Sequence, residues 1–597
     1  MSMKDAVPGL TAEEGAVRRA PSSGPGRKAS APRGMRSWPH TLFNVVLAII
    51  VAYLVLVPLV ILLFSSFKNS GTSLPFQVPG FSIANYSSIF TSSRLASVSF
   101  NTFVYVVGAL LVSLVCSVGL AYLFERTDIP GRRVLEPLAL APMAVPVTVM
   151  AIAWALVANP ANGPIAILVR QFFGVNIDIY TMPGMILVMG LFGVPSMYLM
   201  IAPALASIGP EFEEAAATLG APLRRRLRLI VLPLIGPAVS AASLLLVVII
   251  LEGFAIPAIL GLPKQIFVFS SLIQYYLQNP TGVANYGQAS TYGILILIIT
   301  MALTIVYRRR TRHAERYRVV TGKGYRRSRT SLGRWRAPIA IVVWLYMIFS
   351  VLLPIFALIW TSLSPYNRPI TWSGLGTMTV NNYTDIFTAP GMSQILSNTA
   401  QVVLVTATVT TALSLWIALS ASRRSFRGSG LLMESTSLVL GIPSVVLGAA
   451  VLFLYLFLPL PIFDTPWIII VALVTRFLPR GSRLLQAALL QLDDGLMEAA
   501  QVTGASPFTV TRTVLLPLLR PAMLKTWLWI FAHALGELPI ALLLTSAHNN
   551  TLVVQLWNLF TTSADYPHAC ALAVFILTIS TVAVLVVNRR ETNGGVA

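Results

Sequence analysis

Long apolar runs, separated by short polar segments, make up most of this chain. A helix that crosses a bilayer needs about 20 mostly apolar residues, and twelve runs reach that length. The pattern therefore predicts an all-α polytopic membrane protein with twelve transmembrane helices. The predicted spans are 41–66, 100–124, 134–158, 182–206, 227–256, 288–307, 337–362, 396–421, 431–458, 466–489, 514–543 and 568–588.

Two other segments do not fit this pattern. Residues 163–173 are apolar but too few to cross a bilayer, so we expect a helix at the membrane interface. Residues 1–39 are rich in Pro, Gly, Ser and Arg and show no apolar periodicity, which is typical of a disordered tail.

The composition agrees with a membrane protein and excludes most soluble classes. Of the 597 residues, 56% are hydrophobic and 11% are charged, whereas a soluble chain carries about a quarter charged residues. Cys116 and Cys570 are far apart and each lies in an apolar run. They indicate neither a disulfide framework nor a metal site.

The net charge of +21 is explained by where the basic residues lie. Segment 308–336 alone carries twelve basic residues and one acid, and we assign Arg480 and Arg483, near the inner boundary of the span 466–489, to the loop after it. Cytoplasmic loops carry an excess of Lys and Arg, so both termini are predicted to be cytoplasmic. The basic segment is expected to lie against anionic lipid, and nucleic acid is not needed as a partner. The predicted outer loops hold only Lys68, Arg94, Arg170, Lys264 and Arg368.

The chain repeats itself, which predicts two homologous halves. Asn85-Tyr86 returns as Asn382-Tyr383, and Pro146 returns as Pro443, both 297 residues later. Because each half has six predicted spans, the two halves share one orientation in the membrane. The expected organisation is a basic cytoplasmic tail 1–39, a six-span domain 40–307, a basic cytoplasmic linker 308–336, a second six-span domain 337–590 and a C-terminal tail 591–597.

A second pair of repeats predicts a short helix on the cytoplasmic surface of each half. In the first half, acids at residues 211–214 suit a helix start, and Gly220 followed by Pro222 forms a stop signal. The second half has the same order of acids, Gly504 and Pro507. Small residues on such a helix allow the backbone of another helix to come close. Those on these two helices are Ala215, Ala216, Ala499 and Ala500.

These two segments resemble the signature of ABC importer permeases. The family motif is Glu-Ala-Ala, three residues, Gly, nine residues, an aliphatic residue, one residue and Leu-Pro, and both copies match its spacing. The resemblance implies a type I ABC importer permease fold whose two helices each dock into one of two copies of an ATPase subunit. The residues it marks are Glu214, Ala215, Ala216, Gly220, Glu498, Ala499, Ala500 and Gly504.

The same resemblance implies a division of labour between subunits. The chain contains no Gly-x-x-x-x-Gly-Lys-Ser/Thr loop for phosphate, so we expect a transport subunit that is not an enzyme. ATP and Mg²⁺ are then bound by the partner ATPase, and this chain needs no cofactor of its own. An extracytoplasmic solute-binding protein is expected to dock on the outer loops of a multi-pass protein of the bacterial inner membrane.

Acidic residues inside membrane helices are costly, so they are candidates for the transport path. Glu252 and Glu537 lie late in two spans, beside glycine and shortly before proline, which favours broken helix ends. A path or gate role and a purely structural role remain equally open. Lone His533 is expected to be a hydrogen-bonded core residue, and no metal-ligand spacing occurs. The path or gate candidates are Glu252, Gly253, Pro257, Gly536, Glu537 and Pro539.

The fused two-half form is similar to that of ferric iron permeases, which favours ferric iron as the substrate. Thiamine and 2-aminoethylphosphonate permeases resemble the chain as well. From a different class, an ion-coupled secondary transporter would need coupling residues at the midplane. Only Glu252, His533 and Glu537 could serve that purpose, and the paired cytoplasmic helices would have no role.

Overall fold

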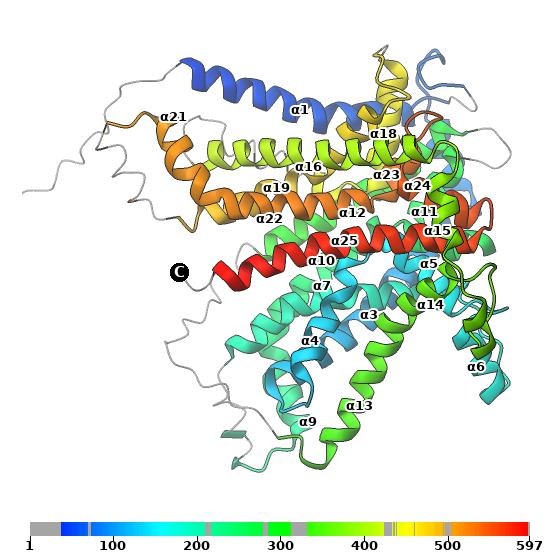
Figure 1. Cartoon of the computed structure of the whole chain (residues 1–597). Helices are drawn as coiled ribbons and strands as arrows, with labels where there is room; N and C mark the ends of the chain where they lie inside the picture. Colours follow the sequence, from blue (N-terminus) through cyan, green and yellow to red (C-terminus); the bar gives the residue numbers. More distant parts are fainter. Residues whose placement is uncertain are drawn as a thin grey trace, which may run out of the picture.

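The computed structural model describes residues 38–69, 73–208, 215–216, 218–278, 284–311, 331–422, 433, 436, 439–458, 460–492, 495, 502 and 504–594. All regular structure in these ranges is helical. The long helices run alongside one another (Figure 1). The first half contains α1 (Trp38–Ser66), α3 (Ser93–Arg126), α4 (Arg132–Leu140), α5 (Val147–Val157), α7 (Met182–Ser207), α10 (Leu232–Glu252) and α12 (Tyr286–Thr311). The second half contains α13 (Arg336–Met347), α14 (Leu353–Ser362), α16 (Met392–Ser422), α18 (Ser444–Phe457), α19 (Pro466–Leu489), α22 (Leu516–Leu535) and α25 (Tyr566–Gly594).

Shorter helices lie at the ends of this bundle. At one end, α9 (Leu223–Arg226) and α21 (Pro507–Val510) follow the two motif glycines, and we call it the motif end. The opposite end, which we call the loop end, carries α6 (Pro164–Phe173), where the sequence predicts an interfacial helix. The other short helices are α2 (Ala84–Thr91), α11 (Phe269–Leu277), α15 (Asn381–Thr388), α23 (Leu538–Leu544) and α24 (Leu552–Thr561).

Nine helices among the described residues are long and apolar enough to cross a membrane, and a bent pair raises the number to ten. That pair is α4 with η1 (Ala141–Ala144), followed by α5 after a bend of 107°. The two other predicted spans, 431–458 and 466–489, are not among these helices, and each has a physical reason. Helix α18 has only 14 residues, and α19 carries three arginines within its 24 residues. The chain is thus an all-helical multi-pass membrane protein, and the number twelve stays a prediction.

Three long helices contain a π-helical turn directly before a Leu-Pro pair. These turns are η2 (Leu227–Val231), η7 (Ile348–Leu352) and η10 (Thr511–Leu515). Proline has no N–H, and its ring clashes with the carbonyl four residues back. A π turn widens the helix at that point, so the chain continues through the proline. Turns η2 and η10 are 284 residues apart and begin equivalent spans.

The two halves pack in a reciprocal way. Helix α3 packs on α7, as α16 packs on α19. Helix α1 contacts α12 of its own half and α18 of the other half, while α14 contacts α25 of its own half and α5 of the other. The first span of each half therefore reaches across to the opposite half. One continuous hydrophobic core includes residues of both halves.

Atomic contacts repeat between the halves as the sequence does. The Asn85 amide donates hydrogen bonds to the carbonyls of Ser66 (3.1 Å) and Lys68 (2.8 Å) at the end of α1. Asn382 donates in the same way to the carbonyls of Ser362 and Ser364, both at 2.8 Å, at the end of α14. The Asn-Tyr repeat is therefore a clamp that joins each first span to the short helix after it.

Candidate functional site

The motif end displays two equivalent glycine turns. Gly220 and Gly504 have φ angles of +78° and +82°, the left-handed region that glycine adopts at helix ends. The N–H of Ala221 donates to the carbonyl of Ala216 across the first turn at 2.9 Å. This bond closes a helix end of the Schellman type. Ala215 is helical in the structure, whereas Glu214, Glu498, Ala499 and Ala500 lie outside the described residues.

Both glycine turns are open to a partner. A Cβ atom placed on Gly220 or Gly504 would meet no atom of the described residues within 4 Å. Beside them, Leu219 and Val502 are each 88% exposed. Large apolar side chains exposed beside a polar surface are typical of a protein–protein contact. The geometry at this end suits docking of another protein on each turn.

The predicted path residues lie at two breaks in the helices. Glu252 is the last residue of α10, and Gly253 after it has an extended backbone. Pro257 opens the π turn η3 (Pro257–Gly261). In the second half, Gly536 ends α22, and Pro539 is the second residue of α23. Glu537 stands between these two helices as the N-cap of α23.

An ion pair between the halves connects one of these breaks to α19. The Arg476 guanidinium donates to Oε2 of Glu252 at 2.6 Å and to the carbonyl of Ile442 at 2.9 Å. Both charged side chains are largely buried. Arg476 also interacts electrostatically with Glu537, and Ser444 lies within hydrogen-bonding reach of the Glu537 carboxylate. The structure thus gathers the two predicted acids around one arginine.

The same region brings the two halves into close backbone contact. A Cβ atom on Gly536 would lie 2.7 Å from Cβ of Pro146. Pro146 is the N-cap of α5, with φ −56° and ψ 139°. Pro443, its repeat partner, caps α18 with φ −58° and ψ 142°. Both helices that follow these prolines therefore start with the same backbone geometry.

The arginines of α19 are functional candidates that the sequence analysis missed. Arg480 and Arg483 were assigned to the loop after the span 466–489, but both lie inside α19, so the loop assignment is wrong. Arg476, Arg480 and Arg483 recur every three or four residues, a spacing that puts side chains on one helix face. That spacing inside an apolar run is the signal that could have identified them.

His533 is hydrogen-bonded, as the sequence predicts, but its ring is not covered. Its Nδ1 lies 2.8 Å from the carbonyl of Trp529, and its ring stacks on the Trp529 ring at 3.9 Å. The side chain is exposed, although protein surrounds it deep in the bundle. Among the described residues, no group of three or more His, Cys, Asp or Glu side chains could hold a metal.

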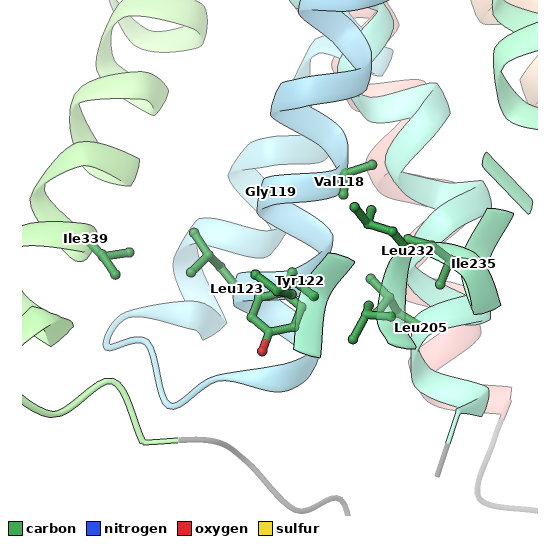
Figure 2. Close-up of a pocket in the computed structure, with 10 residues that line it drawn as sticks. Val118, Gly119, Tyr122, Leu123, Leu205, Leu232, Ile235 and Ile339 are labelled. Carbon is green, nitrogen blue, oxygen red and sulfur yellow. The ribbon is translucent and has the colours of Figure 1, made fainter. Parts of the chain in front are cut away.

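A separate cavity of about 410 Å³ lies near the motif end of the first half. Figure 2 shows Tyr122 of α3, Leu205 of α7, Ile235 of α10 and Ile339 of α13 around it. Its lining is apolar, which suits hydrocarbon and not a hydrophilic solute. We therefore do not assign it to the path.

The loop end is held together by side-chain contacts between loops. Nδ1 of His548 lies 2.6 Å from Oδ2 of Asp464. Hydrogen bonds from Ser546 and His548 hold the pKa of Asp464 below its usual range. This contact therefore contributes fully above the usual aspartate pKa and is lost only as pH falls through the lowered value. The loop end also exposes a large aromatic side chain. Trp372, which follows the first span of the second half, is 91% exposed.

Comparison with known proteins finds one family in both halves. The family described as "Binding-protein-dependent transport system inner membrane component" matches residues 117–316 and 410–590. The chain is 27% identical over 448 residues to the "Ferric transport system permease protein FbpB" of Actinobacillus pleuropneumoniae, covering 74% of this chain and 64% of that protein. It is 26% identical to the "Putative ferric transport system permease protein FbpB 1" of Haemophilus influenzae, with coverage of 84% and 77%.

A relative of about half the length also matches. The "Spermidine/putrescine transport system permease protein PotC" of Escherichia coli is 25% identical over 258 residues. The alignment covers 43% of this chain and 93% of that protein. One half of the present chain thus corresponds in length to a whole permease chain of that system.

Proposed function

Because the chain belongs to the family of binding-protein-dependent transport system inner membrane components, we propose that it is the permease subunit of an ATP-driven ABC importer for ferric iron. The observation that carries this proposal is the pair of glycine turns, Gly220 and Gly504, at one end of two halves that both match the family. The chain forms the translocation path, and a separate ATPase subunit hydrolyses ATP. We extend the proposal to a complete set of twelve spans, arranged in the two domains expected from the sequence.

The motif end is proposed to face the cytoplasm and to bind two copies of the ATPase subunit. Residues Glu214 to Gly220 and Glu498 to Gly504 are the docking segments. The exposed Leu219 and Val502 supply apolar contact area there. Closure of the ATPase dimer moves the two segments, and rigid helices carry that movement into the halves. The basic residues of α9 and of segment 308–336 support this orientation.

The loop end is proposed to receive the solute-binding protein from outside the inner membrane. Loops 68–98, 258–287, 364–394 and 545–567 form its docking surface. The exposed Trp372 lies in one of them, and buried aromatic side chains carry much of the energy in protein interfaces. The breaks at Gly253 and Gly536 form the gate of the path, and the pair of Glu252 with Arg476 holds the halves together there.

Two ferric transport permeases align with 74% and 84% of the chain. Each alignment is longer than one half, so it includes residues of both halves, and this favours ferric iron over other substrates. Thiamine and 2-aminoethylphosphonate remain the alternatives. Recognition of the substrate is assigned to the binding protein. An ion-coupled secondary transporter, the alternative from another class, gives the two glycine turns no role.

Vesicles containing this chain and its co-expressed ATPase test the proposal. Binding proteins loaded with ferric ion, thiamine or phosphonate are added, and ATP hydrolysis and solute uptake are measured. We expect stimulation by the ferric-loaded protein and its loss in the double variant Gly220→Asp and Gly504→Asp. Robust uptake by the double variant would refute the docking role. Failure of any ATPase to co-purify would favour the secondary transporter.

A further inference from the structure

Arg480 is a charged side chain inside the bundle that forms no salt bridge with any of the described residues. It lies in α19, one turn from Arg476 toward the motif end. Its guanidinium carbon lies 5.5 Å from the centre of the Trp529 ring. Within the described part of the chain, no carboxylate lies within 4.0 Å of it. The side chain is partly exposed, although protein surrounds it.

Aromatic rings form a platform beside Arg480, and its guanidinium makes no hydrogen bond to the residues that the structure describes. Trp529 stacks on His533 at 3.9 Å, and Phe477 meets the edges of both rings. A guanidinium over an aromatic face is stabilised by cation–π attraction. Its five N–H donors point outward in the plane of the group. Such a group is suited to bind a phosphate or carboxylate with two parallel hydrogen bonds.

Each of the two nearby acids has one oxygen buried in the protein. Oε2 of Glu252 is bound to Arg476. The remaining oxygen, Oε1 of Glu252, and Oε1 of Glu537 are both buried, with no hydrogen-bond partner among the described residues. Arg476 neutralises Glu252, and Arg480 adds a second, partly exposed positive charge beside it. A bare trivalent cation would be repelled there, whereas an oxyanion would be attracted.

Position ties this site to the path. Residues four apart on a helix share one face and lie about 6 Å apart along its axis. Arg476 bridges to α10 of the other half, so Arg480 lies one turn from the junction of the halves. The equivalent helix of the first half, α7, contains no Lys or Arg. Helix α7 therefore supplies no counterpart to Arg476 and Arg480.

We propose that Arg480, supported by Trp529, binds an oxyanion group of the transported species as it passes between the halves. This inference rests on the proposed transport function. It specifies that ferric ion crosses within a shell of phosphate or carboxylate ligands and not as the bare ion. Phosphate and carboxylate share the chemistry that a guanidinium recognises, and the experiment separates them.

The test has a binding arm and a transport arm. In the first, the complex of this chain with its ATPase is placed in nanodiscs, and equilibrium binding of [³³P]phosphate and [¹⁴C]citrate is measured without a binding protein. In the second, vesicles take up ⁵⁵Fe³⁺ from a ferric-loaded binding protein in the presence of either labelled anion. The variants are Arg480→Gln, Arg480→Lys, Trp529→Leu and Arg170→Gln, the last removing an exposed charge in α6.

We expect Arg480→Gln to abolish saturable anion binding and to lower ⁵⁵Fe uptake at least tenfold. Arg480→Lys keeps the charge and should retain more than a third of the uptake, and Arg170→Gln should match the wild type. Wild-type anion binding or wild-type uptake by Arg480→Gln would overturn the inference. If the wild type takes up ⁵⁵Fe and neither labelled anion enters with it, the inference is also overturned.

Two further outcomes distinguish failure of this inference from misassembly of the variant and from failure of the proposed function. If Arg480→Gln does not assemble with the ATPase, Trp529→Leu tests the platform, because it keeps the charge and should weaken anion binding severalfold. Unchanged anion affinity in Trp529→Leu would then count against the site. If ferric-loaded binding protein fails to stimulate the wild-type ATPase, the proposed function fails, and the binding arm still decides the role of Arg480.

Discussion

At the scale of single residues, the motif glycines are required by backbone conformation and not by space. Both have left-handed φ angles, and in the described part of the chain no atom lies within 4 Å of a Cβ placed on either. An L-residue in that region costs about 1–2 kcal/mol. The turns therefore have sequence requirements even though they face outward.

Replacing Gly220 or Gly504 by Ala should destabilise each turn by about 1 kcal/mol and reduce stimulation of the ATPase. Asn, which tolerates the left-handed region, should restore part of the loss. Gly236→Ala is a matched control, since Gly236 lies in α10 with an ordinary φ and no atom within 4 Å. ATPase stimulation in vesicles is the measurement. Equal loss in the control would show that the effect is not conformational.

Single residues also show the limit of sequence analysis. The breaks at Gly253 and Gly536 could be predicted, because glycine and proline stand beside an acid in an apolar run. Arg480 and Arg483 were assigned to a loop wrongly, because the excess of basic residues in cytoplasmic loops makes an arginine near a span end resemble a loop residue. The ion pair of Arg476 with Glu252 depends on packing between residues 224 positions apart, which no local pattern contains.

At the scale of elements, the Asn-Tyr repeat connects each first span to the helix after it. In each half, one buried amide satisfies two carbonyls at the end of a helix, where carbonyls otherwise lack partners. The repeat was visible in the sequence, but the bonds were not. The number of spans was harder to predict, since α18 is short and the α4–α5 segment is bent.

Asn382→Ala should release α15 from the end of α14. Two buried carbonyls lose their donor, and each unsatisfied group costs about 1–3 kcal/mol. We expect faster amide hydrogen exchange over residues 378–388 and a lower unfolding temperature. The neighbouring Asn381 is exposed, so Asn381→Ala should change neither quantity. Unaltered exchange in Asn382→Ala would show that the clamp does not hold the loop.

At the scale of the whole molecule, the two halves are joined by charge as well as by apolar packing. Glu252 and Arg476 form a buried pair from different halves. Removing one partner of a buried pair leaves an uncompensated charge and typically costs about 3–5 kcal/mol. Replacing both partners by apolar residues costs much less.

A double-mutant cycle with Glu252→Leu and Arg476→Met tests this contact. Each single variant should lower the thermal stability of the purified protein more than the double variant does. The double variant should still show altered transport, because the halves then lack their charged contact at the path. Additive losses of stability would mean that the two side chains do not interact.

The exchange of first spans between the halves has a consequence for biosynthesis. Helix α1 ends at residue 66, but its contact in the other half, α18, begins only at residue 444. Chains grow at about 5–20 residues per second, so α1 waits roughly 20–75 s for that surface to emerge. During this interval its unpaired face is covered by lipid or by the insertion machinery. The first half therefore reaches its final packing only after nearly half of the second half has been made.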